Sequence, residues 1–260
     1  MVKQIKTTEL VWQPDKRQNP IIDSITSSFE TGSFYGVLGP NGAGKTSLVR
    51  QILKLSKKTS GEIYLDDENV ENMTRQKMAT VLSFLPQNIN KDIDFSVADV
   101  VAMGRENKRK MFSPLSEADN QIIDEAMKYT NCYELKDKSI SRLSGGELQR
   151  VMIARTIAQD TPWIILDEPV SNLDVRHQYE LMKVMIKLRE DKGKTIIAIL
   201  HDLNLAARFC DKIVLMKNGK IYDMGDSKKV LTKNNLKSVY DIEFEFINNK
   251  ESIIIAPKYI

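Results

Sequence analysis

The chain is poor in the residues that build cross-linked or metal-centred proteins. Its 260 residues include only two cysteines, Cys132 and Cys210, and two histidines, His177 and His201. So few cysteines exclude a disulfide scaffold, and the four side chains are too widely separated in the sequence to indicate a zinc site. We therefore expect both cysteines to be free thiols in a reducing compartment.

Long apolar runs and a strong excess of one charge are also missing. Apolar stretches such as 196–200 and 253–256 are far shorter than the roughly 20 residues that span a bilayer. The first ten residues lack the apolar core of a signal peptide. With 38 Lys plus Arg against 35 Asp plus Glu, the formal charge is +3, which argues against a dedicated nucleic-acid-binding protein. Any action at a membrane would therefore need a partner.

The remaining composition, 42% apolar and 28% charged residues, is that of a globular chain, and its patterns indicate an α/β fold. Short apolar runs alternate with amphipathic segments, which favours a mainly parallel sheet. The predicted strands are 33–38, 163–166 and 195–200, the predicted helices are 45–55 and 176–189, and a predicted hairpin joins 213–216 to 221–224 through Asn218-Gly219.

The middle of the chain differs from this pattern. Residues 88–150 show helix patterns and turns, with Ser116 and Asp119 placed as a capping box. The end carries two β-like runs, 243–247 and 252–256. We therefore expect a single domain over 1–260, with an α/β nucleotide-binding core at 1–87 and 151–225, a helical subdomain at 88–150, and a tail with a β-hairpin at 226–260.

A phosphate-binding pattern, G-x-x-x-x-G-K-[ST], begins at Gly39 and ends at Thr46. Its glycines let backbone N–H groups wrap phosphates at the positive start of a helix. Lys45 would contact the β- and γ-phosphates of ATP, and Thr46 would offer a hydroxyl to Mg²⁺. The alternative is a glycine-rich surface loop, which the preceding strand pattern disfavours. The predicted nucleotide-binding residues are Gly39, Pro40, Asn41, Gly42, Ala43, Gly44, Lys45, Thr46 and Ser47.

Two acidic residues follow the apolar run that starts at Trp163. Asp167 and Glu168 would stand at the end of a buried strand, where ligands bind in open α/β sheets. We predict that Asp167 holds Mg²⁺ or its water, and that Glu168 orients or deprotonates the attacking water. The alternatives are a helix cap for Asp167 and a solvated acid for Glu168.

The segment Leu143-Ser-Gly-Gly-Glu147 precedes an apolar helix pattern. Ser144, Gly145 and Gly146 can offer polar groups to a second set of phosphate oxygens, and Ser144 with Glu147 can equally form a capping box. With this segment the chain resembles the nucleotide-binding subunits of ABC transporters over nearly its whole length. The resemblance implies a P-loop NTPase fold of the ABC type, in which a mainly parallel sheet is joined by an antiparallel β lobe and a helical subdomain.

Four further motifs stand in the family's order. Gln87 ends a Q-loop-like Phe-Leu-Pro-Gln, which implies contact with Mg²⁺ or the water and sensing of the permease. Ser171-Asn-Leu-Asp174 resembles the D-loop, His201 takes the place of the switch histidine, and Trp12 that of the aromatic that stacks on adenine. The alternative for Trp12 is an ordinary aromatic side chain of a strand or sheet edge, and the alternative for His201 is a hydrogen-bonded histidine at the end of a strand. His177 is interpreted as a helix-face residue. The basic cluster Arg105, Lys108, Arg109 and Lys110 is interpreted as a solvated face, or less favourably as a contact with lipid headgroups.

The resemblance implies an ATP-hydrolysing, energy-coupling subunit on the cytoplasmic face of the cell membrane. The segments 95–105 and 201–208 resemble importers of iron–siderophore, haem and cobalamin complexes, and an iron chelate is the preferred cargo. Implied partners are integral-membrane permease subunits, a second copy of the chain, and an extracytoplasmic substrate-binding protein, with no nucleic acid. The resemblance implies that Ser144, Gly145, Gly146 and Glu147 of one copy bind the γ-phosphate of the ATP held by the other copy, and it places Asp174 of the D-loop among the nucleotide-binding residues. A soluble, non-transport ABC ATPase and a regulatory module without turnover are the disfavoured alternatives.

Overall fold

The computed structural model describes residues 2–87, 94–108, 113–171, 173–249 and 252–258. It contains two compact units. The first unit is Met1–Met73 with Thr195–Ile260, and the second is Thr74–Lys194. The boundaries predicted from the sequence between the nucleotide-binding core and the helical subdomain lie near residues 87 and 150. This functional division stays a prediction.

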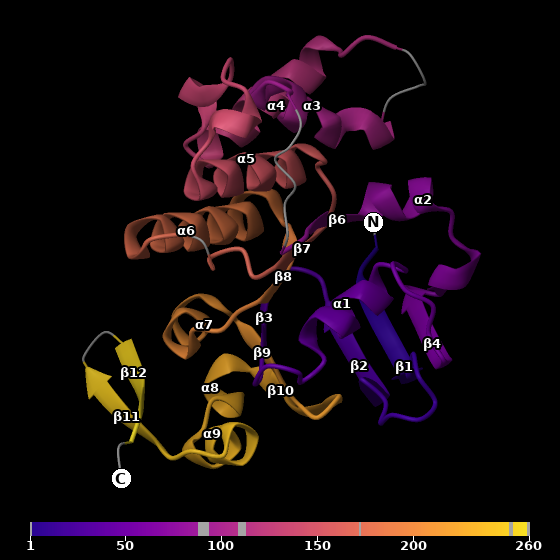
Figure 1. The fold of residues 1–260 in the computed structure, drawn as a ribbon, viewed down its shortest axis with the longest axis vertical. Helices are drawn as coiled ribbons and strands as arrows, with labels where there is room; N and C mark the ends of the chain where they lie inside the picture. Colours follow the sequence, from indigo (N-terminus) through magenta and orange to yellow (C-terminus); the bar gives the residue numbers. More distant parts are fainter. Residues whose placement is uncertain (1, 88–93, 109–112, 172, 250–251, 259–260) are drawn as a thin grey trace. The chain divides into compact units, whose positions relative to one another are not determined.

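The first unit contains a run of four strands in the order β10-β9-β3-β8. The strands are β3 (Phe34–Leu38), β8 (Thr195–Ile199), β9 (Lys212–Lys217) and β10 (Lys220–Asp226). β3 is parallel to β8 and β9, and both β3 and β8 are buried along their whole length. Helix α1 (Lys45–Ile52) lies on one side of these strands and α7 (Leu203–Phe209) on the other (Figure 1). The predicted strands 33–38 and 195–200 are therefore confirmed.

The predicted hairpin and helix in this unit are confirmed with small changes. β9 and β10 pair antiparallel, and Asn218 and Gly219 have positive φ values of 50° and 78°, as a two-residue hairpin turn requires. Helix α1 ends three residues before the predicted residue 55. Its C-terminal turn closes because Lys54 has a left-handed φ of 54° and the N–H of Leu55 donates to the Arg50 carbonyl.

A second, antiparallel sheet of the first unit has the order β2-β1-β4-β5. Its strands are β1 (Gln4–Trp12), β2 (Ile22–Glu30), β4 (Ser60–Leu65) and β5 (Glu68–Asn69), and the short helix η1 (Val70–Asn72) follows. The antiparallel lobe expected from the resemblance is therefore present. Register shifts interrupt the pairing of β1 with both neighbours, and Glu9 has a positive φ of 45°. These irregularities break the strict alternation by which a strand is recognised in a sequence.

The tail completes the first unit. It contains α8 (Ser227–Val230), α9 (Lys233–Tyr240), β11 (Phe244–Asn249) and β12 (Ser252–Pro257). The predicted hairpin is confirmed, with β11 and β12 antiparallel, whereas neither helix was predicted. The amide of Asn204 in α7 exchanges two hydrogen bonds with the backbone of Ile255, at 2.7 and 3.1 Å, and so fixes the hairpin to the unit.

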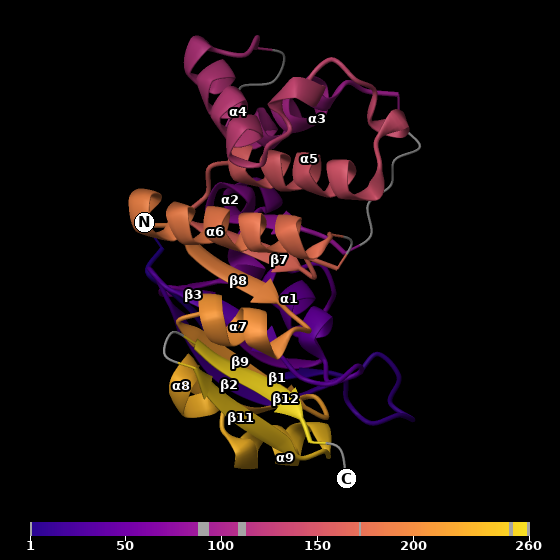
Figure 2. The ribbon, with the colours of Figure 1, turned by 90° about the vertical axis from the view of Figure 1, so that its left-hand side faces the viewer.

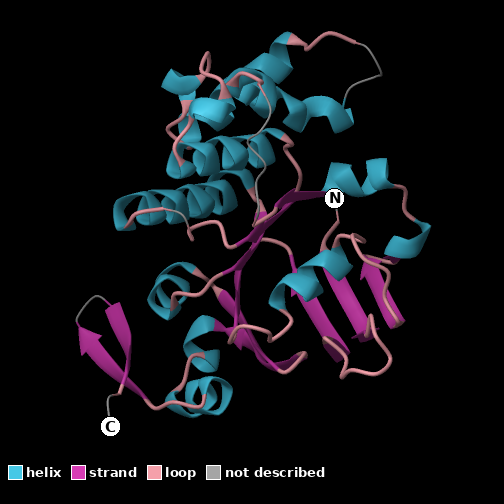
Figure 3. Cartoon of the chain, in the orientation of Figure 1, coloured by secondary structure: helices cyan, strands magenta, loops and turns pink. Residues whose placement is uncertain are grey.

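The second unit is mostly helical (Figures 2 and 3). Its two strands, β6 (Leu82–Leu85) and β7 (Trp163–Asp167), pair in parallel. The described helices are α2 (Arg75–Val81), α3 (Val97–Ala102), η2 (Met103–Lys108), α4 (Glu117–Tyr129), η3 (Tyr133–Leu135), η4 (Ile140–Arg142), α5 (Gly145–Ala158) and α6 (Val175–Lys192). The predicted capping box of Ser116 with Asp119 is present at the start of α4, and the helix predicted over 176–189 is α6.

Within the described ranges, no helix combines the length and the apolar character needed to cross a bilayer. Cys132 and Cys210 are free and buried, as predicted for two unpaired thiols. Burial raises the pKa of both thiols, so both side chains stay protonated and behave as small apolar groups.

Candidate functional site

The phosphate-binding pattern forms the turn between β3 and α1 in the first unit. Glycine is required at its first position, because a Cβ on Gly39 would lie 2.2 Å from the carbonyl oxygen of Met216. Gly44 has a φ of 96°, and a Cβ added there would lie 2.7 Å from the carbonyl oxygen of Ile21. No side chain caps α1, so its first turn begins with backbone N–H groups available to an anion.

Lys45 is buried in this turn rather than extended into solvent. Its Nζ donates to the carbonyl oxygens of Gly39 at 2.7 Å and Pro40 at 3.0 Å. Thr46 and Ser47 in the next positions are half-buried. The ammonium group is therefore fixed inside the loop, which disfavours a flexible surface loop with an exposed lysine.

Two residues outside the pattern contact the loop or its flank. The N–H of Ile21 donates to the carbonyl of Trp12 at 2.9 Å, and the Ile21 carbonyl is the group that packs against Gly44. Trp12 is half-buried at the end of β1. It is linked to the phosphate loop through Ile21, which hydrogen-bonds to Trp12 and contacts Gly44. Tyr240 of α9, which sequence reasoning missed, lies beside Gly39 of the loop: burial raises the pKa of its hydroxyl to about 12, and the contact with the Gly39 backbone acts in the opposite direction.

The paired carboxylates lie at the end of β7 in the second unit. Asp167 is 2% exposed at the last position of this buried strand. Glu168 follows with a φ of 53°, a left-handed conformation that costs energy for a residue with a Cβ and that clusters at functional sites. The turn is held by Ser171, whose N–H and hydroxyl both donate to the Glu168 carbonyl oxygen, at 3.3 and 3.0 Å.

Gln87 reaches the second carboxylate directly. β6 pairs in parallel with β7, and Leu85 is opposite Leu166, so the carboxyl ends of the two strands share one edge. The Nε2 of Gln87 donates to Oε2 of Glu168 at 2.8 Å. The structure therefore brings together two residues that the sequence placed in separate motifs.

The Ser144 segment forms the N-terminus of α5. Ser144 Oγ accepts from the Glu147 N–H at 3.3 Å, and the Glu147 carboxylate accepts from the Ser144 N–H and hydroxyl, both at 2.8 Å. These hydrogen bonds lower the pKa of Glu147. A Cβ on Gly145 would meet no atom of the described residues within 4 Å. The capping interpretation is therefore confirmed, and intramolecular packing does not explain the glycine at position 145.

Asp174 caps α6, and it has a partner that the sequence did not indicate. The N–H of His177 donates to Asp174 Oδ1 at 2.9 Å, and His177 Nδ1 lies 2.9 Å from both carboxylate oxygens. Contact with the His177 backbone, and then with its ring, lowers the pKa of Asp174. His201 follows β8 on an exposed turn, and Asp202 next to it caps α7. Asn172 lies outside the described residues.

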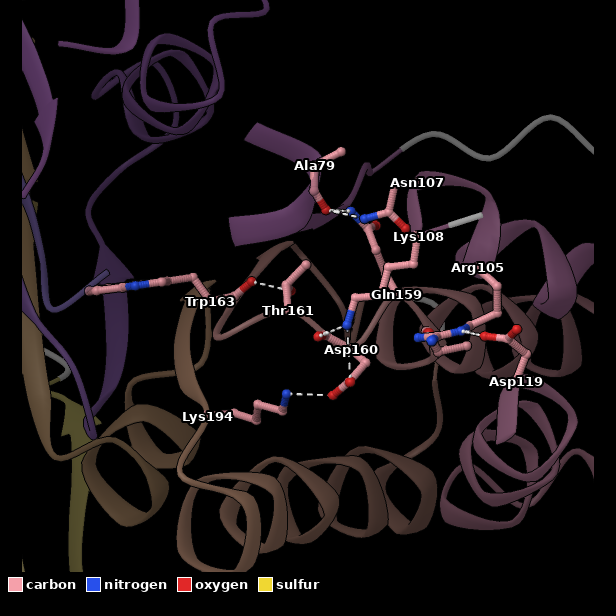
Figure 4. A network of polar contacts seen from close by, with 11 residues as sticks. Ala79, Arg105, Asn107, Lys108, Asp119, Gln159, Asp160, Thr161, Trp163 and Lys194 are labelled. Carbon is pink, nitrogen blue, oxygen red and sulfur yellow. Dashed lines mark hydrogen bonds and ion pairs between the residues drawn. The ribbon is translucent and has the colours of Figure 1, made fainter. Parts of the chain in front are cut away.

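The solvated-face interpretation of the basic cluster is wrong for Arg105. This side chain is buried; its Nε donates to Asp119 Oδ1 at 2.8 Å and its NH1 to the Ala158 carbonyl at 2.8 Å (Figure 4). A compensating carboxylate and carbonyl allow the charge to be buried. Lys108 pairs with Asp160 at 3.1 Å, and Lys194 pairs with the same carboxylate at 2.7 Å. Arg109 and Lys110 lie outside the described residues.

The family model, the similar sequences and the similar structures all come from ABC transporters. A family model described as ABC transporter matches residues 22–171. The petrobactin import ATP-binding protein YclP of Bacillus subtilis (strain 168) is 36% identical over 88% of this chain and 91% of that protein. The ferric enterobactin transport ATP-binding protein FepC of Escherichia coli (strain K12) is 32% identical over 88% and 84%. A solved chain from an inward-facing transporter assigned to the metal-chelate type has a TM-score of 0.84 at 26% identity, covering 99% of this chain and 98% of that one.

Proposed function

The chain belongs to the ABC transporter family, and on that premise we propose that it couples ATP hydrolysis to the import of an iron–siderophore or related metal chelate. It is an ATP-binding ATPase of this family. One observation carries the cargo class: relatives named for the import of petrobactin and of ferric enterobactin each match 88% of the chain. Relatives named for hemin and cobalamin import, each 34% identical, make these the alternative cargos.

The phosphate loop binds the nucleotide in this proposal. Its backbone N–H groups face the phosphates, and the fixed ammonium of Lys45 supplies a point charge to the β- and γ-oxygens. Since Lys45 already donates to two loop carbonyls, it is held in place before nucleotide arrives. Trp12, fixed beside the loop through Ile21, is the proposed stacking partner of the adenine.

Glu168 orients or deprotonates the attacking water. Its left-handed backbone and the Ser171 turn fix the direction in which the carboxylate leaves β7. Gln87 holds one of its oxygens through the 2.8 Å hydrogen bond. A movement of the chain around Gln87 therefore changes the position of the general base, which gives the permease a route to control hydrolysis. His201 is proposed to contact the γ-phosphate.

Mg²⁺ fits the donors that the chain offers. The Thr46 hydroxyl and the Asp167 carboxylate are hard oxygen ligands of the kind Mg²⁺ prefers beside phosphates, and Gln87 offers an amide oxygen. Bound there, the ion would neutralise charge on the transferring phosphoryl group.

Two copies of the chain form the working unit in this proposal. The Ser144 segment, with its open space at Gly145, faces the ATP held by the phosphate loop of the other copy, and Asp174 lies at the same interface. The pair docks on integral-membrane permease subunits at the cytoplasmic face of the membrane. An extracytoplasmic substrate-binding protein delivers the chelate to those subunits.

Uptake of radioactive iron tests this function. The experiment uses a strain that lacks the chain but keeps the permease and binding protein with which the chain co-purifies. Wild-type chain should restore uptake of the ferric chelate and not of cobalamin or haem, and Glu168→Gln should restore none. Restored cobalamin or haem uptake would reassign the cargo, and the absence of any co-purifying membrane protein would contradict the transport role.

A further inference from the structure

A groove with a cavity volume of about 700 Å³ is lined by residues of α4, α5 and α6 in the second unit. None of the predicted nucleotide- or metal-binding residues lines it. Its volume lies in the range of roughly 300–1,000 Å³ that is typical of small-molecule sites. The groove is therefore large enough for a ligand that neither the phosphate loop nor the Ser144 segment binds.

The rim of this groove is cationic. Its lining includes the basic residues Lys128, Arg150, Lys183, Lys187 and Lys192, with Glu125 and Glu180 as the only carboxylates among the described lining residues. Both carboxylates have other partners: Glu125 pairs with Lys192 at 2.9 Å, and Glu180 with Arg176 at 2.9 Å.

Three basic groups of the groove, Lys183, Lys187 and Arg150, form no ion pair with any described residue. Lys183 and Lys187 are exposed one helical turn apart on α6, and neither has an ion-pair partner in the described part of the chain. Like charges at this spacing repel each other. Arg150 of α5 has a buried Nε that makes no hydrogen bond to any described residue. A buried donor in this state is unfavourable unless a ligand or a water molecule supplies the acceptor.

The floor of the groove is apolar. Ile153 of α5 and Leu181 and Val184 of α6 line it, together with the ring of Tyr129. Lys192 lies 5.3 Å from the centroid of that ring. A ligand that fills the groove must therefore offer apolar surface to the floor and negative charge to the basic side chains of the rim.

We propose that this groove binds a small organic anion that joins an apolar body to a carboxylate, sulfonate or phosphate group. The apolar body packs on Ile153, Leu181 and Val184. The anionic group accepts from Arg150 and neutralises Lys183 and Lys187. This binding does not depend on the proposed transport function, because it involves no nucleotide-binding residue.

Fluorescence titration with anilinonaphthalene sulfonate, an aromatic sulfonate, tests the proposal on the full-length chain with saturating ADP present. The double variant Lys183→Gln/Lys187→Gln should raise the dissociation constant of the ADP-insensitive site about fivefold or more, as expected for the loss of two surface charge interactions. A matched control, Lys228→Gln/Lys233→Gln, removes two exposed lysines outside the groove and should leave the constant unchanged. Arg150→Lys, which keeps the charge and loses Nε, should also weaken binding.

Uncharged phenylnaphthylamine separates charge from apolar contact. It should bind more weakly than the sulfonate to the wild type, and equally to the wild type and the double variant. Equal sulfonate affinity in the wild type and the double variant would overturn the proposal. An equal loss in the control variant would also overturn it, because the effect would then report net charge alone. Binding of an acidic peptide without binding of the sulfonate would show that the occupant is a protein segment instead.

Discussion

Lys45 and Glu168 show how single side chains can be held ready by their own backbone surroundings. Lys45 donates to the carbonyls of Gly39 and Pro40, so the phosphate-binding turn itself holds the ammonium group in place. Glu168 has a left-handed backbone whose turn is closed by Ser171. In both cases the local backbone sets the position of a charged group, so that less reorganisation is needed when a substrate binds.

Lys45→Ala should lower the rate of ATP hydrolysis about a hundredfold or more, since a fixed donor to the transferring group is lost. The measurement is steady-state ATPase activity, with thermal unfolding as a check on the fold. Lys54→Ala is a matched control, because Lys54 also donates to backbone carbonyls, those of Val70 and Glu71, and also stands in the first unit. It should keep wild-type activity. Equal losses in the two variants would assign Lys45 a purely structural role.

At the scale of elements, three helices of the second unit begin with the same device. Ser96 with Asp99, Ser116 with Asp119, and Ser144 with Glu147 form capping boxes at α3, α4 and α5. Among the described residues, the second box is the one whose acid also pairs with a buried arginine. Arg105 joins the start of α4 to the end of α5 through Asp119 and Ala158, which fixes the helix whose other end carries Ser144.

Asp119→Asn should reduce the free energy of unfolding by about 3 kcal/mol near neutral pH, because it leaves the buried Arg105 charge unpaired. Asp99→Asn is the matched control and should cost about 1 kcal/mol, the value of a cap alone. Urea denaturation of the wild type and both variants measures the two losses. Equal losses would mean that the Arg105 contact does not contribute to stability.

The same contact predicts a pH dependence. Hydrogen bonds from Ser116, and then from Arg105, lower the pKa of Asp119 from 3.8 to about 2. A lowered pKa in the folded state means that the stabilisation is complete above the unfolded value of 3.8 and is lost as pH falls toward 2. The stability difference between wild type and Asp119→Asn should therefore shrink between about pH 4 and pH 2. A difference that stays constant over this range would contradict the assigned contact.

The sequence predicted those elements whose patterns are local. The buried strands at 33–38, 163–166 and 195–200, the hairpin at Asn218-Gly219 and the Ser116 box each have a short, regular pattern. β1 was missed because its pairing shifts register twice, and Arg105 was misjudged because its partner Asp119 lies fourteen residues further along the chain. The contact between Gln87 and Glu168 depends on which strands pair, and a motif does not contain that information.

Tyr240→Phe tests a contact that the sequence did not indicate. The substitution keeps the ring of Tyr240 and removes the hydroxyl that contacts the Gly39 backbone. We expect the KM for ATP to rise up to about fivefold, the worth of one hydrogen bond, with little change in unfolding temperature. Tyr222→Phe, at a tyrosine that is 47% exposed, is the control. An unchanged KM in Tyr240→Phe would show that Tyr240 of the tail does not contribute to ATP binding at the phosphate loop.

At the scale of the whole molecule, family membership and the fixed positions of Lys45 and Glu168 both support ATP hydrolysis. The chain belongs to the ABC transporter family, and a relative of known name matches 88% of it. The proposed working unit is a pair of copies, in which the phosphate loop and the Ser144 segment of one chain are proposed to serve two different nucleotides. The central claim is that Glu168 activates water for hydrolysis in such a pair.

Glu168→Gln tests this claim most directly. The replacement keeps the size and hydrogen bonding of the side chain but removes the basic carboxylate, so hydrolysis should fall about a hundred- to ten-thousand-fold. ATP binding should persist, because Lys45, Thr46 and Asp167 are intact. ATPase rate and light scattering, measured on one preparation with Glu134→Gln as the control, should show an inactive, ATP-loaded dimer that accumulates. Near wild-type turnover with no trapped dimer would contradict the account.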